Sequence, residues 1–462
     1  MLTYDLELRG TLSLYDFLYH CIKEDILSGR LKPGEHLPSK RALARHLQVS
    51  VVTVETAYAQ LCAEGYLFSR EKRGYFVNAL EIQPLRPSRP PAEFPSAEPR
   101  QWQVDLSASG GSTGGFPFSV WAKLMRQVLS QQGTDLLQPI PHNGVPQLRQ
   151  AISDYLYHFR GISAAPEQIV VGAGTEYLYN LIVQLLGQDK VYGLEDPGYL
   201  KAGRIYALNG AACVPIPIDR LGAAVEQVEL SGAQVLHLSP SHQFPTGAVT
   251  PIARRQALLK WAEQGRQRYI IEDDYDSEFR FTGRPIPPLQ SIDHSGRVIY
   301  INTFSRTLSP SLRISYMVLP LTLLQSYQQN LGFYSCTVPA MEQHTLARFL
   351  NGGFFEQHLN RTRLIYRTKR DQVIAALNES PLAGRFRISG ENAGLHFLLT
   401  LDTQRTDQEL TQAAEQANIR LSFLSDYCRL PRPQWNHTLI LHYPNLDLDA
   451  LVPVLETLAH LL

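Results

Sequence analysis

The sequence contains few cysteines, and none of them lies near another in the chain. The five are scattered over 462 residues without a C-x-x-C pair, at Cys21, Cys62, Cys213, Cys336 and Cys428. Closely paired cysteines mark zinc or dithiol sites, and dense disulfide frameworks belong to small secreted chains. We therefore expect reduced, buried cysteines, no metal site and a cytoplasmic location.

Long hydrophobic runs are also missing. No stretch of about 18 uninterrupted apolar residues occurs, which excludes a membrane-spanning helix. Asp5 and Glu7 precede any apolar stretch, so we expect no signal peptide. Net charge is missing too, because 43 Lys and Arg balance 43 Asp and Glu. That balance excludes a uniformly basic protein but leaves room for a local basic patch.

Proline, in contrast, is concentrated in one segment. Six of the sixteen residues of Pro84–Pro99 are prolines, which fix φ and remove backbone donors, so we expect an extended spacer there. The chain is long enough to hold more than one domain. We predict a small domain over residues 1–80, a linker over 81–103 and a large domain over 104–462.

The small domain has the pattern of helices followed by a hairpin. Apolar residues recur with a 3.6-residue period from Leu14 to Ile26, and Ser39 and Ser50 are good N-caps for two further helices. Two short β-like runs then bracket the charged tip at residues 70–74. A helix-turn-helix with such a wing places its recognition helix in the major groove of DNA.

Basic and polar side chains gather on the parts of this domain that would face DNA. Lysine and arginine neutralise phosphates, and hydroxyl groups donate to phosphates or bases. The predicted DNA-contacting residues are Lys40, Arg41, Arg45, Ser50, Thr53, Tyr58, Arg70, Lys72, Arg73 and Gly74. A winged helix can instead mediate protein contacts, in which case these charges form a solvated face.

Residues Gly29–Leu67 resemble the winged-helix signature of the GntR family of bacterial repressors. The resemblance implies binding to a double-stranded DNA operator. The family usually has arginine directly after the serine that starts the recognition helix. This sequence has Val51 there, which indicates an altered operator contact.

The large domain alternates nearly continuous apolar runs with helical segments. Such runs are typical of strands buried on both faces, so we predict an α/β domain with a seven-stranded, mostly parallel sheet. The runs are 168–171, 191–195, 211–216, 234–238, 269–272, 298–302 and 314–318. Further strand-like runs at 395–401 and 438–443 predict a smaller α+β lobe at the C-terminus.

Polar residues follow several of these strands, where ligands of α/β sheets bind. Gly174, Thr175 and Glu176 open a helix directly after a strand, and backbone N–H groups at such a helix start cradle phosphate. Another strand ends in a dense carboxylate cluster that includes Asp273. On residue types alone, that cluster is compatible with a cofactor, a metal or a solvated strand end.

Taken together, these segments resemble the cofactor site of fold-type-I pyridoxal-phosphate enzymes, which include the aminotransferases. The resemblance implies that an aromatic residue covers the cofactor ring, an aspartate pairs with its nitrogen, and hydroxyls and an arginine hold its phosphate. The residues at the matching positions are Gly174, Thr175, Glu176, Tyr199, Asp273, Tyr275, Thr303, Ser305, Arg306 and Arg313.

Three positions depart from that family's pattern. Phe244 stands where the family has a ring-contacting asparagine, and the strand-like run 438–443 lacks the carboxylate-binding arginine. Arg429 is either a substitute for that arginine or a surface residue. Arg306 replaces the lysine that forms the internal aldimine.

Arg306 changes the expected chemistry. A Schiff base needs an amine that can lose its proton, whereas a guanidinium stays protonated. The domain is then expected to bind pyridoxal phosphate non-covalently. Alternatively, it recognises a preformed cofactor–amino-acid adduct, the pyridoxamine form or an unrelated anion.

The whole layout resembles the MocR/GabR subfamily of GntR transcriptional regulators. The resemblance implies a head-to-tail homodimer that binds DNA, pyridoxal 5'-phosphate and a small amino-compound effector. We therefore expect a transcriptional regulator with no catalytic residue. Two alternatives stay open, namely an aminotransferase with an appended DNA-binding module and a regulator whose ligand-free large domain serves only for dimerisation.

Overall fold

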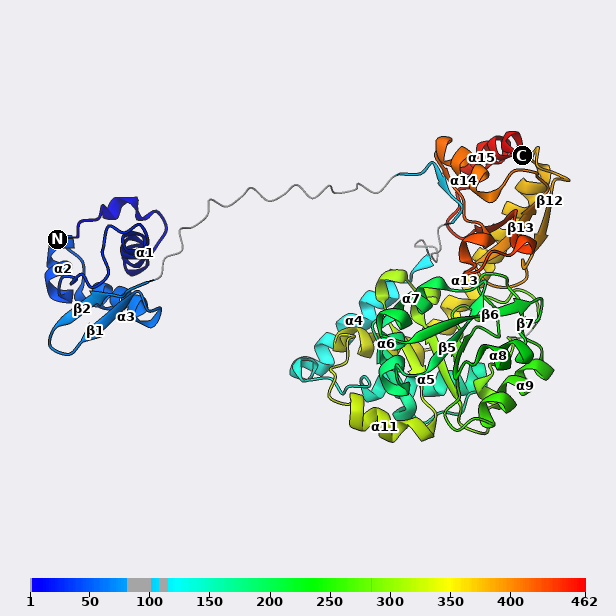
Figure 1. The fold of residues 1–462 in the computed structure, drawn as a ribbon, viewed down its shortest axis with the longest axis horizontal. Helices are drawn as coiled ribbons and strands as arrows, with labels where there is room; N and C mark the ends of the chain where they lie inside the picture. The colour runs from blue at the N-terminus through cyan, green and yellow to red at the C-terminus, as the bar shows by residue number, and fades with distance from the viewer. Residues whose placement is uncertain (1, 81–100, 108–114, 284) are drawn as a thin grey trace. The chain divides into compact units, whose positions relative to one another are not determined.

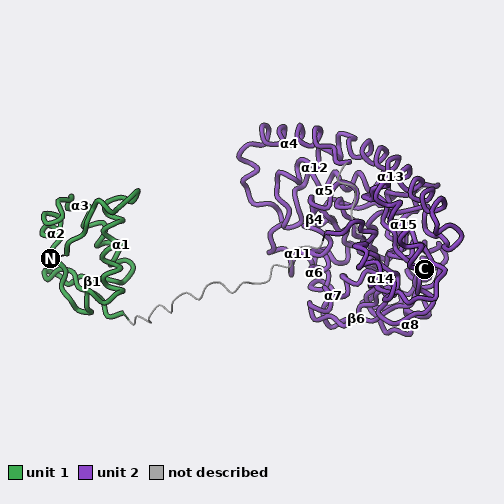
Figure 2. The backbone as a smooth tube through the Cα atoms, turned by 90° about the horizontal axis from the view of Figure 1, so that it is seen from above, with its two compact units in different colours: residues 1–99 green, residues 100–462 purple. Residues whose placement is uncertain are grey.

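The computed structural model describes residues 2–80, 101–107, 115–283 and 285–462. It divides the chain into two compact units, Met1–Pro99 and Arg100–Leu462 (Figure 2). Most of the predicted linker, 81–103, lies outside the described residues. The two units are described separately below.

The N-terminal unit is a winged helix-turn-helix, as predicted. Its elements are α1 (Leu14–Leu27), α2 (Lys40–Leu47), α3 (Val51–Ala63), β1 (Leu67–Arg70) and β2 (Gly74–Val77). The Ser39 hydroxyl accepts a hydrogen bond from the Ala42 N–H at 3.2 Å, and the Ser50 hydroxyl accepts one from the Thr53 N–H at 3.0 Å. Both serines therefore act as the predicted N-caps, because they satisfy amides that the helix leaves free.

The core of this unit forms between α1, α2 and α3. Ile22, Leu43, Val54 and Leu61 are fully buried in it. Strands β1 and β2 pair antiparallel and bury Leu67 and Val77 against the same cluster. The unit therefore has a hydrophobic core of its own.

The second unit is built on an eight-stranded sheet with the order β4-β11-β10-β9-β8-β5-β6-β7. Figure 1 labels β5, β6 and β7 of this sheet. Strands β10, β9, β8, β5 and β6 run parallel. At one edge β11 pairs antiparallel with both β10 and β4, so β4 runs in the same direction as the parallel strands, and at the other edge β7 pairs antiparallel with β6. The strands are β4 (Ile169–Gly172), β5 (Val191–Asp196), β6 (Ala212–Asp219), β7 (Gly222–Ala223), β8 (Val235–Leu238), β9 (Tyr269–Asp273), β10 (Val298–Thr303) and β11 (Ser315–Val318). Each of the seven predicted runs is a strand, and the two-residue β7 is an addition.

Helices cover both faces of this sheet. They are α4 (Phe118–Gln132), α5 (Pro146–Tyr155), α6 (Thr175–Leu186), α7 (Leu200–Leu208), α8 (Val225–Ser231), α9 (Ile252–Glu263), α10 (Phe304–Thr307), α11 (Leu321–Leu331) and α12 (Ala340–Asn351). On one face of β10, Tyr300 packs in a hydrophobic cluster with residues of α4, α5 and α12. On the other face, Ile299 and Ile301 pack in a second hydrophobic cluster with residues of α6, α7 and α11. Successive residues point to opposite faces, so a strand covered on both sides must be apolar throughout.

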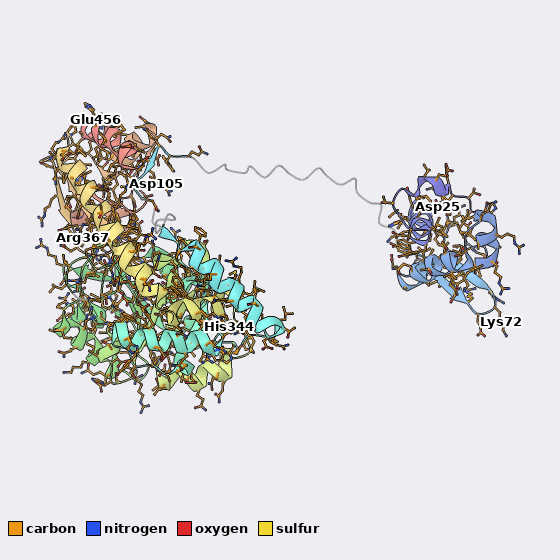
Figure 3. The ribbon with its side chains drawn as sticks, turned by 180° about the vertical axis from the view of Figure 1, so that it is seen from behind. Asp25, Lys72, Asp105, His344, Arg367 and Glu456 are labelled. Atoms are coloured by element: carbon orange, nitrogen blue, oxygen red, sulfur yellow. The ribbon has the colours of Figure 1, made fainter. Side chains whose placement is uncertain are left out.

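The C-terminal part forms the predicted α+β lobe. It has a three-stranded sheet in the order β12-β13-β15 and the long helix α13, on which Figure 3 labels Arg367. Its elements are α13 (Phe354–Glu379), β12 (Phe386–Ser389), β13 (His396–Leu401), α14 (Asp407–Gln416), β14 (Ile419–Arg420), β15 (Thr438–His442) and α15 (Leu448–Leu461).

The chain enters the second unit along this lobe. Strand β3 (Val104–Asp105) pairs parallel with β14. The Gln103 N–H donates to the Asn418 carbonyl at 2.9 Å, and the Leu106 N–H donates to the Arg420 carbonyl at 3.0 Å. Within the described ranges, no helix is long and apolar enough to cross a membrane.

Candidate functional site

A cavity of about 290 Å³ lies where the parallel strands of the large sheet end. Asp273 ends β9, Thr303 ends β10, and Ser239 directly follows β8. The residues that line it are Gly174, Thr175, Glu176, Tyr179, Tyr199, Lys201, Ser239, Phe244, Asp273, Tyr275, Thr303, Ser305, Arg306, Arg313 and Tyr427. All ten residues predicted to bind a cofactor are therefore in one cavity, at the edge where α/β sheets bind ligands.

One corner of the cavity is shaped for an anion. Gly174 precedes α6 with φ of 91°, and a Cβ there would lie 2.5 Å from Nη2 of Arg313. A side chain at position 174 would therefore displace Arg313. The first turn of α6 leaves backbone N–H groups free beside this arginine, which favours a phosphate.

Glu176 pairs with two cations at this corner of the cavity. Its carboxylate accepts hydrogen bonds from Lys201 and, at 3.1 Å, from Arg313. The hydrogen bond from Lys201, together with the charges of Lys201 and Arg313, lowers the pKa of Glu176. Its side chain therefore orients the two cations, and an anion would meet Arg313 and the backbone instead.

Asp273 is the buried carboxylate of the site. Its Oδ2 accepts a hydrogen bond from the Tyr179 hydroxyl at 2.5 Å and lies 3.3 Å from Nε2 of His237. Burial, followed by the Asp273 charge, raises the pKa of Tyr179 well above its usual value, so Tyr179 stays protonated and donates. Asp273 Oδ1 is also buried, but it has no hydrogen-bond partner among the described residues.

Tyr179 and His237 are site residues that the sequence reasoning missed. Tyr179 follows Thr175 by one helical turn, so both lie on the same face of α6. His237 is the polar residue within the apolar strand β8, and its Nδ1 lies 2.7 Å from the Tyr206 hydroxyl. The spacing of Tyr179 from Thr175 and the presence of a histidine in a buried strand were the two features of the sequence that could have identified these residues.

Aromatic rings form one wall of the cavity. Phe244 contacts Tyr199 and Tyr275 edge to face, with 6.1 Å between ring centroids in each pair. Tyr199 is 39% exposed and Tyr275 lies deeper, with its hydroxyl 3.2 Å from Nδ1 of His242. An aromatic ligand would therefore meet ring surface on this side of the cavity.

Arg306 and Arg429 differ in their surroundings. Arg306 is half-buried in the cavity wall, and no hydrogen bond or ion pair joins its guanidinium to another described residue. Arg429 lies against α7, because a Cβ on Gly203 would be 1.6 Å from its Nη2. Arg429 does not line the cavity, so it does not replace the missing carboxylate-binding arginine there.

In the N-terminal unit, most of the predicted DNA-contacting residues are accessible. Arg41, Arg45, Arg70 and Arg73 are exposed, and Lys72 lies at the tip of the β1–β2 hairpin, where it projects outward (Figure 3). Lys40 forms an ion pair with Glu55 at 2.5 Å. Ser50 and Thr53 lie at the start of α3, and Gly74 begins β2 in the wing.

Tyr58 has to be removed from that set. It is fully buried in the core, and its hydroxyl donates to the Pro38 carbonyl at 3.0 Å. Its ring also contacts Tyr75 edge to face. Tyr58 therefore stabilises the packing of α3 and has no free surface for DNA.

The N-terminal unit matches a known family. Residues 14–77 match the model described as "Bacterial regulatory proteins, gntR family". The full chain is 34% identical to the probable rhizopine catabolism regulatory protein MocR of Rhizobium meliloti, over 93% of this chain and 90% of that protein. This chain is a MocR-type regulator of the GntR family.

Other comparisons agree with that membership. The MocR-type chain is 41% identical to the uncharacterized HTH-type transcriptional regulator YdeL of Bacillus subtilis, over 88% of each chain. Its fold resembles a kynurenine aminotransferase of Pyrococcus horikoshii, with a TM-score of 0.67 and 23% identity over 78% of this chain and 90% of that one. An aminotransferase of Thermococcus profundus gives a TM-score of 0.69 with 22% identity and the same coverage. The large unit of this MocR-type regulator therefore has the fold-type-I aminotransferase architecture.

Proposed function

We propose that this MocR-type regulator binds an operator in double-stranded DNA and that its aminotransferase-like domain holds pyridoxal 5'-phosphate without a covalent bond. The observation that carries the second part is the unpartnered Oδ1 of Asp273. A buried carboxylate oxygen without a donor is unfavourable, and the protonated ring nitrogen of the cofactor is the donor that would satisfy it.

The residues present suit this cofactor at both of its ends. Arg313, Ser305 and the backbone amide of Thr175 at the start of α6 would hold the phosphate. Asp273 would hold the ring nitrogen, with Tyr179 fixing the carboxylate. Tyr275 would contact the ring oxygen, and Tyr199 would shield the ring from water. When bound, the cofactor supplies an electron-withdrawing ring.

Arg306 is the reason to propose a sensor of an amino compound rather than an enzyme. Its guanidinium cannot lose a proton, so it can neither form the covalent link nor shuttle the proton that transamination needs. We also propose a cytoplasmic, head-to-tail homodimer, on the basis of the family layout. A working aminotransferase remains the competing function, and turnover of amino donors by the purified protein would favour it.

Cofactor binding can be tested through tryptophan fluorescence. All four tryptophans, Trp102, Trp121, Trp261 and Trp435, belong to the large unit. Added pyridoxal phosphate should quench them, and borohydride should leave no adduct on residue 306. Asp273→Asn should weaken binding about tenfold or more, because the ring nitrogen loses a charged partner. Glu263→Gln, an exposed change on α9, should leave the affinity unchanged, and equal affinities in all three proteins would contradict the proposal.

DNA binding can be tested with fragments selected from a random pool by the full chain. Replacing Arg70, Lys72 and Arg73 by alanine should weaken binding at every sequence and reduce its salt dependence. Lys32→Ala changes an exposed charge outside the predicted set and should alter binding less. Equal loss in both variants would contradict the assignment of the wing.

A further inference from the structure

A groove of about 430 Å³ lies between the large sheet and the C-terminal lobe. One wall contains Asp219, at the end of β6, together with Arg220 and the loop 246–248. The other wall belongs to the lobe and includes Arg387 of β12, so strand β6 and the lobe strands β12 and β13 meet here (Figure 1). None of the residues that line this groove also lines the cavity around Asp273. The groove is therefore a separate place for a ligand.

The lobe wall of the groove is one face of the three-stranded sheet. Arg387, Thr400 and Thr438 are direct cross-strand neighbours, so their side chains stand in one row on the same face. The alternate residues Leu399 and Leu439 point to the opposite face, where they pack with residues of α13, α14 and α15. Helices thus cover the opposite face, whereas the row with Arg387 lines the groove.

Two arginines line the groove without acidic partners. Arg220 and Arg387 are exposed, and no hydrogen bond or ion pair joins either guanidinium to another described residue. Among the described residues, Asp219 is the one acid that lines the groove, and Arg254 donates to its two oxygens at 2.5 Å and 3.0 Å. The hydrogen bond from Arg254 lowers the pKa of Asp219, which stays ionised and paired. Each wall therefore contributes one uncompensated positive charge.

The base of the groove is apolar. Leu398, Leu424 and Ile440 form a buried cluster, against which the ring of Trp435 packs. Leu398, Leu424 and Trp435 also line the groove. Ser389 stands beside Leu398 across the strands, and its hydroxyl has no hydrogen-bond partner among the described residues. An apolar surface with a few polar groups around it is the usual composition of a small-molecule site.

The free arginines indicate the charge of the ligand. Guanidinium groups bind carboxylates and phosphates through parallel N–H···O hydrogen bonds. A phosphate monoester carries close to two negative charges near neutral pH and offers three acceptor oxygens, whereas a carboxylate carries one charge. One phosphate can therefore pair with both guanidiniums, which favours it over a carboxylate in this groove.

We propose that this groove is a second ligand site, which takes a small phosphate monoester with a planar or apolar body. Arg220 and Arg387 hold the phosphate from the two walls, and Ser389 donates a hydrogen bond to it. Leu398 and Trp435 contact the body of the ligand. Because the two arginines come from different walls, such a ligand joins the lobe to the large sheet. The site goes beyond the proposed function and does not depend on pyridoxal phosphate in the other cavity.

Phenyl phosphate is the probe for this site, and Trp435 is the reporter. Full-length protein with 5-fluorotryptophan at its four tryptophans is observed by fluorine NMR, and Trp435→Phe identifies the resonance of Trp435. That resonance should shift saturably with phenyl phosphate. Benzoate should bind about tenfold or more weakly, because it brings one charge to two guanidiniums, and neutral benzyl alcohol should cause no saturable shift.

Variants then assign the binding to residues. Arg220→Gln and Arg387→Gln should each weaken phenyl phosphate binding about tenfold or more, since each removes a charge-assisted pair. Arg367→Gln makes the same change at an exposed position of α13, on the helix-covered side of the lobe sheet, and should leave the affinity unchanged. Thermal melting of each variant checks that it folds.

Arg313→Gln separates the groove from the proposed cofactor site. Binding seen at Trp435 that is lost in Arg313→Gln but kept in Arg220→Gln would place the phosphate in the other cavity and overturn this inference. Equal affinities for benzoate and phenyl phosphate would overturn the preference for a phosphate. An equal loss in Arg367→Gln would show general charge attraction, and the absence of any saturable shift would remove the site. Each of these results leaves pyridoxal phosphate binding to be judged by Asp273→Asn alone.

Discussion

Arg306 shows how far one side chain can change the chemistry of a cavity whose other residues suit a cofactor. An amine at this position could be neutral part of the time and attack an aldehyde, whereas a guanidinium stays charged. The surrounding hydroxyls of Thr303, Ser305 and Tyr275 line the cavity beside it. The consequence for reactivity can be tested by restoring the amine.

Arg306→Lys is expected to create the missing covalent link. In the presence of pyridoxal phosphate the variant should become yellow, and borohydride should fix the cofactor to residue 306, as shown by peptide mass spectrometry. Arg306→Gln should stay colourless under the same conditions. A colourless Arg306→Lys protein that still quenches with the cofactor would show that the ring lies out of reach of position 306.

Glu195 makes stability depend on pH. It is buried at the end of β5, where burial raises its pKa to about 8, against hydrogen bonds from the Ser239 N–H and the Gln243 side chain. The folded protein keeps this proton up to about pH 8, whereas the unfolded chain releases it near 4.5. Because the unfolded state then binds fewer protons, stability from this group is lost as pH rises between those values, by up to about 1.4 kcal/mol per unit.

Glu195→Gln should remove that part of the pH dependence. The measurement is urea unfolding of both proteins from pH 5 to pH 8, followed by tryptophan fluorescence. As pH increases, the free energy of unfolding of the original protein should fall relative to that of the variant. A constant difference across this range would contradict the assignment to Glu195.

At the scale of elements, the recognition helix carries the clearest departure from the family. Val51 begins α3 and is 41% exposed, so an apolar side chain stands where the family usually has arginine. Val51→Arg should add a phosphate contact, which steepens the dependence of log Kobs on log salt by about 0.9.

The control places the same charge at the far end of the helix. Gln60→Arg adds an exposed arginine near the C-terminus of α3 and should leave the slope nearly unchanged. The slopes are compared by DNA titrations over a series of salt concentrations. A slope that steepens equally in both variants would indicate general charge attraction instead of a contact at position 51.

The sequence predicts long elements well and very short pairings poorly. All seven long strands of the large sheet were recognisable because burial on both faces makes them apolar throughout. Strands β3, β7 and β14 have two residues each, which leaves no periodicity to detect. Tyr58 was misjudged for another reason, since its spacing from Val54 and Leu61 already placed it on the buried face of α3. Its hydroxyl suggested a polar role that its position on the helix excluded.

Site residues were predictable where they belong to a local motif. Glycine, threonine and aspartate at strand ends are visible in the sequence, and all of those predicted line the cavity. Arg220 and Arg387 were not predictable as a pair, because they line one groove only through the packing of the lobe against the large sheet. Residues that support a site from distant strands leave no local signature.

At the scale of the whole molecule, two units with separate hydrophobic cores predict two unfolding events. A fragment of residues 1–80 should fold alone, since its core is complete within it. In the full chain, pyridoxal phosphate should raise the melting temperature seen by tryptophan fluorescence, which reports only the large unit.

The transition of the small unit should not respond to the cofactor. Calorimetry of the full chain and of the 1–80 fragment, each with and without pyridoxal phosphate, measures the melting temperature of the small unit in both proteins. A single transition that shifts as a whole with added cofactor would contradict independent folding. A fragment that fails to fold would do the same.

The pairing of β3 with β14 has a mechanical consequence. Backbone hydrogen bonds fasten residues 103–106 to the C-terminal lobe, which also supplies Arg387 to the groove. Residues 103–106 are thereby part of the C-terminal lobe, so any displacement of this lobe carries them with it.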